Sequence, residues 1–342
     1  MGGQAARRSE HRTLKALVTG GGGFLGKAIV ELLLQRGDSV RSLARGDYPQ
    51  LAARGVETLR GDIADPMVVE RAAKGIDVVF HVAGKPGMWG PLEDYRRTNV
   101  VGTDNVIAAC LRHGVPKLVF TSTPSVVHGG VDIEGADESL PYPDHFDGPY
   151  PQTKAEAERH VLAANSPQLA TVALRPHLIW GPGDNHLLPR LLERARSGRM
   201  AFVGSEDKLI DTVYIDNAAA AHLSACDRLA PDAACAGKAY FISQGEPWPA
   251  SRITNAMLRA AGFAQVTRRI PVGLAYAIGA VVETAYRAFG VEAEPPVTRF
   301  VVRQMSTAHW YDISAAKRDL GYEVRVGIEE GLERLRMSLS IG

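Results

Sequence analysis

Tyr150 and Lys154 stand four residues apart in the segment YPQTK. On a helix this spacing places both side chains on one face, one turn apart, and Pro151 fits the first helical turn, where its missing N–H is not needed. The helix dipole and the ammonium both favour phenolate, so we expect the pKa of Tyr150 to lie below its ordinary value of about 10. Such a phenol can act as a general acid or base. The same spacing is common on ordinary solvated helices, so the assignment depends on a cofactor and a substrate.

A glycine-rich turn follows a short apolar segment near the N-terminus. Residues 15–19 (KALVT) have the composition of a strand, residues 20–26 (GGGGFLG) come next, and residues 27–36 have helical spacing. Glycines let the backbone turn sharply and approach a pyrophosphate, which the helix N-terminus then faces. The motif begins at either Gly20 or Gly21, and a flexible loop without a ligand is the alternative. The pattern predicts a dinucleotide site.

The end of the second predicted strand, residues 39–43, bears on which dinucleotide is bound. NAD enzymes of this architecture place a carboxylate there, on the ribose hydroxyls, whereas this chain has Ala44 and Arg45. A guanidinium can pair with a 2′-phosphate that a carboxylate would repel. We therefore predict NADP as the cofactor. NAD is the alternative if Arg45 only lies on the surface.

Apolar strands alternate with helical segments through the first half of the chain. This rhythm predicts an α/β fold, a Rossmann-type doubly wound parallel sheet covered by helices on both faces. The predicted strands are residues 15–19, 39–43, 57–60, 78–82, 117–121 and 171–175, and the main predicted helices are residues 27–36, 95–113 and 151–163.

The alternation loosens after about residue 180, which suggests a division of the chain. We expect residues 14–180 to form the dinucleotide-binding domain and residues 181–342 to form a smaller C-terminal substrate-binding lobe, partly interleaved with the first domain. Clefts between such lobes are usual ligand sites. Residues 1–13 are polar and basic without an apolar core, so we expect a disordered extension rather than a secretory signal.

Candidate substrate contacts lie where ligands of open parallel sheets bind, at the carboxyl ends of the strands. Thr123 follows the predicted strand 117–121, and its hydroxyl can hydrogen-bond a substrate oxygen beside Tyr150; an ordinary Ser/Thr turn is the alternative. Four aromatic or polar-tipped residues near strand ends or near Tyr150 are candidates for the substrate pocket, although a lone histidine is more often structural. They are Trp89, His145, Phe146 and His177.

The composition argues against several kinds of partner and site. With 342 residues and a formal net charge of +1, the chain has no basic excess that would favour nucleic acid. Its three cysteines have no metal-ligand spacing and form no disulfide framework, so we expect no metal site and a reducing, cytoplasmic location. We also expect the chain to assemble as a homo-oligomer.

One uncharged segment, Ile270–Val282 (IPVGLAYAIGAVV), follows Arg268 and Arg269. It is too short to span a bilayer, which takes roughly 20 apolar residues. It could lie at a lipid interface as a peripheral membrane contact, contact another enzyme, or line an apolar substrate entrance. A buried helix of the second lobe is the alternative.

Together the motifs resemble those of the extended short-chain dehydrogenases/reductases, and more closely their 3β-hydroxysteroid dehydrogenase branch. The resemblance covers the chain from Lys15 to the C-terminus and rests on Thr19–Gly26, Asp62-Ile63, Asn99, Thr123 and the Tyr150/Lys154 pair. It implies hydride exchange between a nicotinamide and a secondary alcohol or ketone, with catalytic roles for Thr123, Tyr150 and Lys154. It also implies cofactor contacts for Gly20, Gly23, Phe24, Leu25, Gly26, Asp62 and Ile63, with Tyr150 and Lys154.

Two subgroups of that branch compete, and both act on a 3-oxygen function beside a carboxylated carbon of a large apolar substrate. Sterol-4α-carboxylate 3-dehydrogenases, whose product decarboxylates as a β-keto acid, are resembled by residues 131–142 and by Arg175-Pro176-His177. Bacterial 2-alkyl-3-oxoalkanoate reductases are resembled by residues 45–51, 85–90 and 178–184. The sterol dehydrogenase is our first expectation and the reductase the alternative. A cofactor-binding regulator without turnover is a third possibility, against which the intact catalytic set argues.

Overall fold

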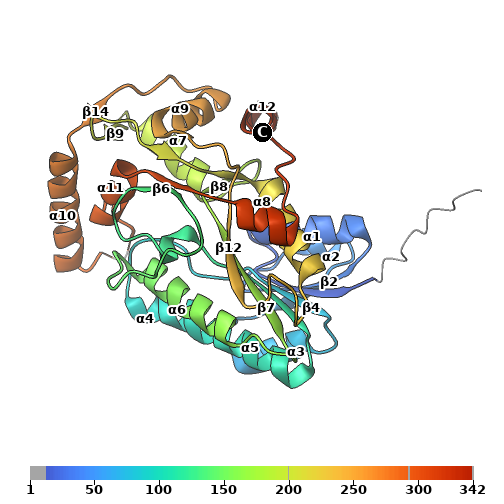
Figure 1. Cartoon of the computed structure of the whole chain (residues 1–342). Coiled ribbons are helices and arrows are strands. Elements are labelled where there is room, and N and C mark those ends of the chain that lie inside the picture. The colour runs from blue at the N-terminus through green and yellow to red at the C-terminus, as the bar shows by residue number, and fades with distance from the viewer. Residues whose placement is uncertain (1–12, 199, 292, 341–342) are drawn as a thin grey trace, which may run out of the picture.

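A seven-stranded sheet forms the centre of the computed structural model, which describes residues 13–198, 200–291 and 293–340. Residues 1–12 of the predicted extension lie outside the described residues. The strand order is β12-β7-β5-β4-β1-β2-β3, and every pairing is parallel (Figure 1). The strands are β1 (Lys15–Thr19), β2 (Ser39–Ala44), β3 (Glu57–Arg60), β4 (Val78–His81), β5 (Lys117–Thr121), β7 (Ala170–Pro176) and β12 (Lys238–Ile242). The predicted Rossmann-type fold is confirmed.

Helices cover both faces of this sheet because its strands are apolar on both sides. On one face α1 (Phe24–Arg36) packs beside α8 (Ile215–Arg228), with Ile29 and Ala221 in the same buried cluster. On the other face lie α3 (Pro66–Ala73), α5 (Gly102–His113) and α6 (Pro149–Ala163), which Figure 1 shows side by side below the sheet. The strand order reverses between β1 and β4, and such a reversal opens a ligand crevice at the carboxyl ends of the strands.

The predicted helix 95–113 is longer and less regular than expected. It begins as α4 (Leu92–Arg96), passes through a five-residue π-helical turn, η1 (Arg97–Val101), and continues as α5. A π-helical turn inserts an extra residue into the helix, and such turns are frequent at functional sites. No spacing rule applied to the sequence distinguishes this turn from the surrounding α-helix.

The second half of the chain both completes the central sheet and builds a separate layer. β12 and α8 return to the central sheet. A four-stranded sheet, in the order β13-β10-β15-β6, joins β6 (Ile133–Ala136) to strands from beyond residue 208. The remaining strands are β8 (Ile179–Trp180), β9 (Phe202–Val203), β10 (Leu209–Ile210), β11 (Val213–Tyr214), β13 (Trp248–Pro249), β14 (Arg269–Ile270) and β15 (His309–Tyr311).

The helices of this second layer lie at the periphery. They are α7 (Leu187–Arg196), α9 (Ala250–Ala260), α10 (Val272–Ala288), α11 (Arg299–Ser306) and α12 (Ile328–Ser340). Figure 1 shows α10 at the left edge of the molecule, beside α11. The apolar segment Ile270–Val282 falls mainly on α10. Among the described residues, no helix combines the length and apolar character that crossing a membrane requires.

Candidate active site

A cleft of about 660 Å³ opens at the carboxyl ends of the central strands. All the residues predicted to be catalytic or to contact the cofactor line it, although they come from five separate parts of the chain. They are Gly20, Gly23, Phe24, Leu25, Gly26, Arg45, Asp62, Ile63, Thr123, Tyr150 and Lys154. Strands β1, β2, β3 and β5 each end at this cleft, so the parallel sheet itself gathers these residues.

The glycine turn has the shape that a closely approaching ligand requires. Gly20 has a φ of +71°, in the left-handed region that favours glycine. A Cβ at Gly26 would lie 2.1 Å from the carbonyl oxygen of Gly20, so α1 can pack this closely only with glycine there. Gly21 does not line the cleft but faces Ser42, which a Cβ at Gly21 would meet. The register beginning at Gly20 is therefore the one that faces a ligand.

The N-terminus of α1 points at this cleft and has no side-chain cap. Its first N–H groups therefore remain available to an anion, and the helix dipole favours negative charge at this end. The uncapped helix and the side-chain-free surface of Gly20 and Gly23 fit the pyrophosphate of a dinucleotide. The cleft residues thus fit the cofactor that the motif predicts.

Tyr150 and Lys154 lie in the first turns of α6, which begins at Pro149 after Gly148. The Lys154 side chain is 5% exposed, and its Nζ donates to the carbonyl oxygen of Thr121 at 2.6 Å. The same nitrogen lies 4.0 Å from the centre of the Phe120 ring. Lys154 is therefore fixed by the end of β5, and Tyr150 is placed beside it by the helix.

The electrostatics of this pair differ from the sequence expectation. Burial raises the pKa of Tyr150 to about 12, and a hydrogen bond with Thr123 opposes that shift. Burial lowers the pKa of Lys154 to about 7, opposed by the charge of Glu158. The expectation of a lowered pKa for Tyr150 is wrong for this arrangement, because burial raises the pKa of the phenol more than the Thr123 hydrogen bond lowers it. At neutral pH the group that faces the cleft is a phenol.

Hydrogen bonds from η1 hold α6 against the loop after β4. Asn99 accepts from the backbone N–H of Lys85 at 2.7 Å, and its Nδ2 donates to the Lys85 carbonyl at 3.2 Å and to Thr153 Oγ1 at 3.1 Å. Because Thr153 lies between Tyr150 and Lys154, Asn99 links the catalytic turn to the cleft wall formed by Gly84 and Pro86.

The four predicted substrate residues do not line this cleft. The Trp89 indole N–H donates to the carbonyl of Val291 at 3.2 Å, and its ring packs edge-on against Tyr286. His177 is buried with its ring against His309 and Tyr311, although its neighbours Pro176 and Leu178 do line the cleft. His145 is exposed in the loop before α6, and Phe146 packs on the main apolar cluster.

Several cleft residues escaped the sequence analysis. Tyr48 packs across the glycine turn, and a Cβ at Gly22 would meet its ring at 2.2 Å. Leu178 lines the cleft with a φ of +43°, an unusual conformation for a residue other than glycine. Asn185 and His186 contribute from the start of α7. Tyr48 could have been predicted, because it is an aromatic residue three positions after Arg45, whereas no sequence pattern predicts the backbone conformation of Leu178.

Within the described ranges, no group of three His, Cys, Asp or Glu side chains has the geometry of a metal site.

Comparison with known families identifies the chain. The model of the 3-beta hydroxysteroid dehydrogenase/isomerase family matches residues 17–272. The chain belongs to this family. It is an NAD(P)-dependent oxidoreductase of the short-chain dehydrogenase/reductase type, as the resemblance implied.

Relatives within the family differ in their activities. A 2-alkyl-3-oxoalkanoate reductase of Stenotrophomonas maltophilia is 53% identical over 95% of this chain and 99% of its own length, and one of Shewanella oneidensis is 51% identical over 95% and 86%. The mouse sterol-4-alpha-carboxylate 3-dehydrogenase is 36% identical over 94% of this chain and 89% of its own length.

Solved structures agree on the fold. The crystal structure of gox2253 superposes with a TM-score of 0.76 at 28% identity, covering 95% of this chain and 98% of that one. The UDP-glucose 4-epimerase of Thermotoga maritima reaches the same TM-score at 21% identity, covering 96% and 99%. This second likeness concerns the fold alone.

Proposed function

We propose that this protein reduces the 3-keto group of a 2-alkyl-3-oxoalkanoate, with a nicotinamide cofactor as the hydride donor. Two reductases of that kind are 53% and 51% identical to this chain over 95% of its length, whereas the sterol dehydrogenase is 36% identical over 94% of it. The order of our sequence expectations is therefore reversed, and the reductase becomes the first candidate.

The positions of the two sets of resembling segments carry this choice. The segments that resemble the reductases border the cleft, through Arg45 and Tyr48 in residues 45–51, Pro86 in residues 85–90, and Leu178 in residues 178–184. The segments that resemble the sterol dehydrogenases lie mostly elsewhere. Residues 131–142 contribute β6 and its neighbouring turns, His177 packs on His309, and of this set only Pro176 lines the cleft. More of the residues that can touch a ligand in the cleft therefore belong to the first set.

The protonation states suit reduction of a ketone. When bound, the nicotinamide supplies a hydride to the carbonyl carbon, and the carbonyl electron pair moves to oxygen. Tyr150, kept as a phenol by its raised pKa of about 12, donates its proton to that oxygen. Thr123 gives the same oxygen a second hydrogen bond where charge develops. We assign Lys154 to the ribose of the cofactor, because the end of β5 fixes its amine at the cleft.

We propose NADPH rather than NADH as the donor. Arg45 lines the cleft directly after β2, where an NAD enzyme would present a carboxylate. A smaller chamber of about 110 Å³ beside it is lined by Ser42, Thr58 and Arg60, which supply hydroxyl and guanidinium donors, and also by one carboxylate, Asp47. Arg60 Nε donates to the backbone carbonyl of Arg45 at 3.1 Å, which places the two arginines together. This combination suits a 2′-phosphate.

A two-by-two assay tests the proposal. A 2-alkyl-3-oxo acid would be offered with NADPH or with NADH, and a 3-hydroxy-4-carboxysterol with NADP+ or with NAD+. The absorbance of the nicotinamide is followed in each case. We expect NADPH oxidation with the oxo acid, and we expect Arg45→Glu to lower the NADPH-to-NADH ratio of kcat/KM by at least about tenfold, equivalent to about 1.4 kcal/mol. Turnover of the sterol but not of the oxo acid would instead support a sterol dehydrogenase activity. Cofactor binding without turnover of either substrate would favour the regulator.

A further inference from the structure

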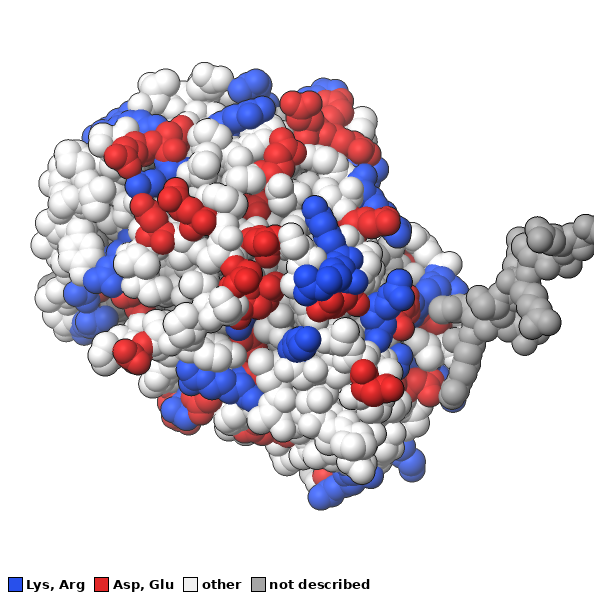
Figure 2. Space-filling view, in the orientation of Figure 1, with Lys and Arg blue, Asp and Glu red and all other residues white. Residues whose placement is uncertain are grey.

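The outer face of α10 is an uncharged apolar stripe. Leu274, Ile278 and Val281 are 53%, 43% and 69% exposed, and their spacing of four and three residues places them on one side of the helix. Val272 and Phe289 extend the exposed apolar surface at the two ends. We call this surface the α10 stripe. Figure 2 shows the left edge of the molecule, where α10 lies, as largely free of charged atoms.

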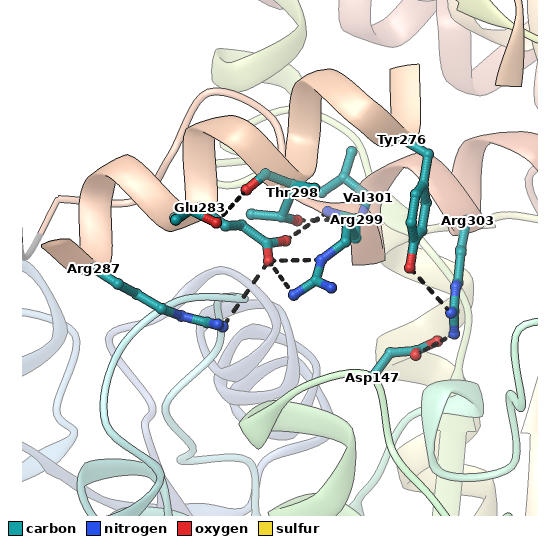
Figure 3. Close-up of polar contacts among 10 residues, drawn as sticks. Asp147, Tyr276, Glu283, Arg287, Thr298, Arg299, Val301 and Arg303 are labelled. Carbon is teal, nitrogen blue, oxygen red and sulfur yellow. Dashed lines mark hydrogen bonds and ion pairs between the residues drawn. The ribbon is translucent and has the colours of Figure 1, made fainter. Parts of the chain in front are cut away.

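The acidic residue of α10 faces away from this stripe. Glu283 is 6% exposed and accepts from the backbone N–H of Arg299 at 2.7 Å and from its Nε at 2.9 Å, with Arg287 at 3.9 Å (Figure 3). Gly279, on the same inner side, lies so close to α11 that a Cβ there would stand 3.1 Å from the backbone nitrogen of Arg299. The inner face is therefore tightly packed and its carboxylate is neutralised.

Cations border the stripe at both ends. Arg268 and Arg269 precede α10, and Arg287 lies in its last turn. All three are exposed; Arg269 also pairs with Asp207 at 3.6 Å and Arg287 with Glu283 at 3.9 Å. A second copy of this chain is a poor match, because two stripes paired in either direction would bring arginine-rich ends together. The α10 stripe and its arginines are complementary to a partner that has an apolar interior and an anionic surface.

We propose that α10 lies flat on an anionic lipid membrane, with the α10 stripe at the boundary between headgroups and acyl chains. Apolar side chains on one face and basic residues at the margins are the features of an interfacial helix, and each nearby arginine adds electrostatic attraction to anionic lipid. The helix has 17 residues and does not cross the bilayer.

The contacts of α10 and α11 connect the proposed membrane face to two loops, one before α6 and one after β4, whose neighbours line the cleft. Arg303 of α11 pairs with Asp147, three residues before Tyr150, and also donates to the Tyr276 hydroxyl of α10 at 3.4 Å (Figure 3). The residues after α10 meet the loop after β4 through the bond from Trp89 to Val291. An apolar substrate dissolved in lipid would thus reach the cleft without crossing open water.

Vesicle cosedimentation with the full chain tests this inference. We expect binding to phosphatidylglycerol vesicles that weakens with salt, and much weaker binding to phosphatidylcholine vesicles. Leu274→Glu and Val281→Glu should each reduce the binding to phosphatidylglycerol at least about tenfold. Each substitution removes apolar area that the membrane would bury and adds a negative charge that the anionic lipid repels. Met67→Glu is the matched control, since Met67 is 70% exposed on α3, and it should bind like the wild type.

Unchanged turnover of a water-dispersed substrate by each variant would establish that the fold is intact. Equal vesicle binding by the wild type and both stripe variants would overturn the inference. So would an absence of vesicle binding together with a change in sedimentation equilibrium in the variants, since the stripe would then be a contact between protein chains. The binding measurement contains no substrate, so its failure would leave the proposed reduction untouched.

Discussion

Tyr150 reaches the cleft from the first turn of α6, where burial raises its pKa and keeps it protonated. We expect Tyr150→Phe to lower kcat by roughly two to four orders of magnitude, the usual contribution of a general acid. Cofactor affinity should change little, because the ring remains. Steady-state kinetics and cofactor titration would separate the two effects. Tyr286→Phe, the same chemical change on α10, should have neither effect, and loss of cofactor binding in Tyr150→Phe would mean that the tyrosine is structural.

His81 lies behind the cleft and makes stability depend on pH. Its Nδ1 is 2.7 Å from Thr19 Oγ1 and its Nε2 is 3.0 Å from Thr103 Oγ1. Burial, with a smaller contribution from the charge of Lys154, lowers the pKa of His81 to about 3. Between that value and the unfolded pKa of about 6.5, only the unfolded chain binds the proton. This contribution to stability is therefore present above about pH 6.5 and lost as the pH falls toward 3.

We expect His81→Gln to flatten that dependence. The slope of the free energy of unfolding against pH should decrease by up to roughly 1.4 kcal/mol per pH unit. The stability at neutral pH also falls, because the hydroxyls of Thr19 and Thr103 each lose one of their hydrogen-bond partners. Urea unfolding at several pH values between about 4 and 7 would measure both changes. His145→Gln, the same substitution in an exposed loop, is the control. An unchanged slope in His81→Gln would rule out His81 as the titrating group.

For single residues, the sequence predicted the position best where a motif occurs in only one backbone arrangement. The glycine turn, Thr123 and the Tyr150/Lys154 pair all line one cleft because each follows a strand or begins a helix at the same edge of the sheet. Protonation was not predictable, since the desolvation of Tyr150 depends on chain segments far away in sequence. The candidates His145, Phe146 and His177 were chosen by residue type and by their position near strand ends or near Tyr150, and neither property determines where a side chain points.

Helix α6 is held against β7 by a buried ion pair. Glu158 accepts from Arg175 at 2.6 and 3.0 Å and from the Tyr142 hydroxyl at 2.6 Å, and the Glu158 side chain is fully buried. Glu158 is one turn beyond Lys154, so this pair holds the turn that carries Lys154 at a fixed position against β7.

We expect Glu158→Gln to destabilise the protein by roughly 3–5 kcal/mol, because it leaves the guanidinium of Arg175 buried without its partner charge. The double variant Glu158→Gln/Arg175→Met should recover much of that loss. Chemical unfolding would give both values. Glu156→Gln, which removes a partly exposed partner of Arg96 from the same helix, should cost less than about 1 kcal/mol. A similar loss in both single variants would contradict the role of the buried pair.

At the scale of elements, periodicity predicted the strands well and the helix ends less well. β1 and β5 have the predicted bounds, because short apolar runs between turn residues have few alternatives. Helices α1 and α6 begin earlier than predicted, at Phe24 and Pro149. The π-helical turn η1 was missed, since it arises from contacts of Asn99 with Lys85 and Thr153 rather than from local spacing.

Across the whole molecule, Trp89 connects segments from the two halves of the chain. Its ring packs on Tyr286, Arg287 lies 5.4 Å from its centre, and its indole N–H holds Val291. We expect Trp89→Ala to raise hydrogen exchange both in residues 85–91 and in residues 286–291, because each segment loses the same contact. Trp89→Phe should have a smaller effect, since it keeps a ring and loses only the hydrogen bond. Increased exchange in only one segment would show that the two move independently.

The assembly of the chain was beyond reach of its sequence, since patterns within one chain do not reveal surfaces between chains. Homo-oligomerisation stays a prediction, as does any contact with another enzyme.

The sheet receives its last strand from late in the chain. β12 pairs with β7, and α8 packs beside α1 over the same face. During synthesis, therefore, a chain that has emerged only as far as β7 presents an open strand edge and an uncovered apolar surface, both of which invite association with other nascent chains. A protease or a stop codon that removed the second half would not leave a smaller working nucleotide-binding protein. It would leave an incomplete sheet with an open edge at β7, because the strand that covers this edge ends only at Ile242.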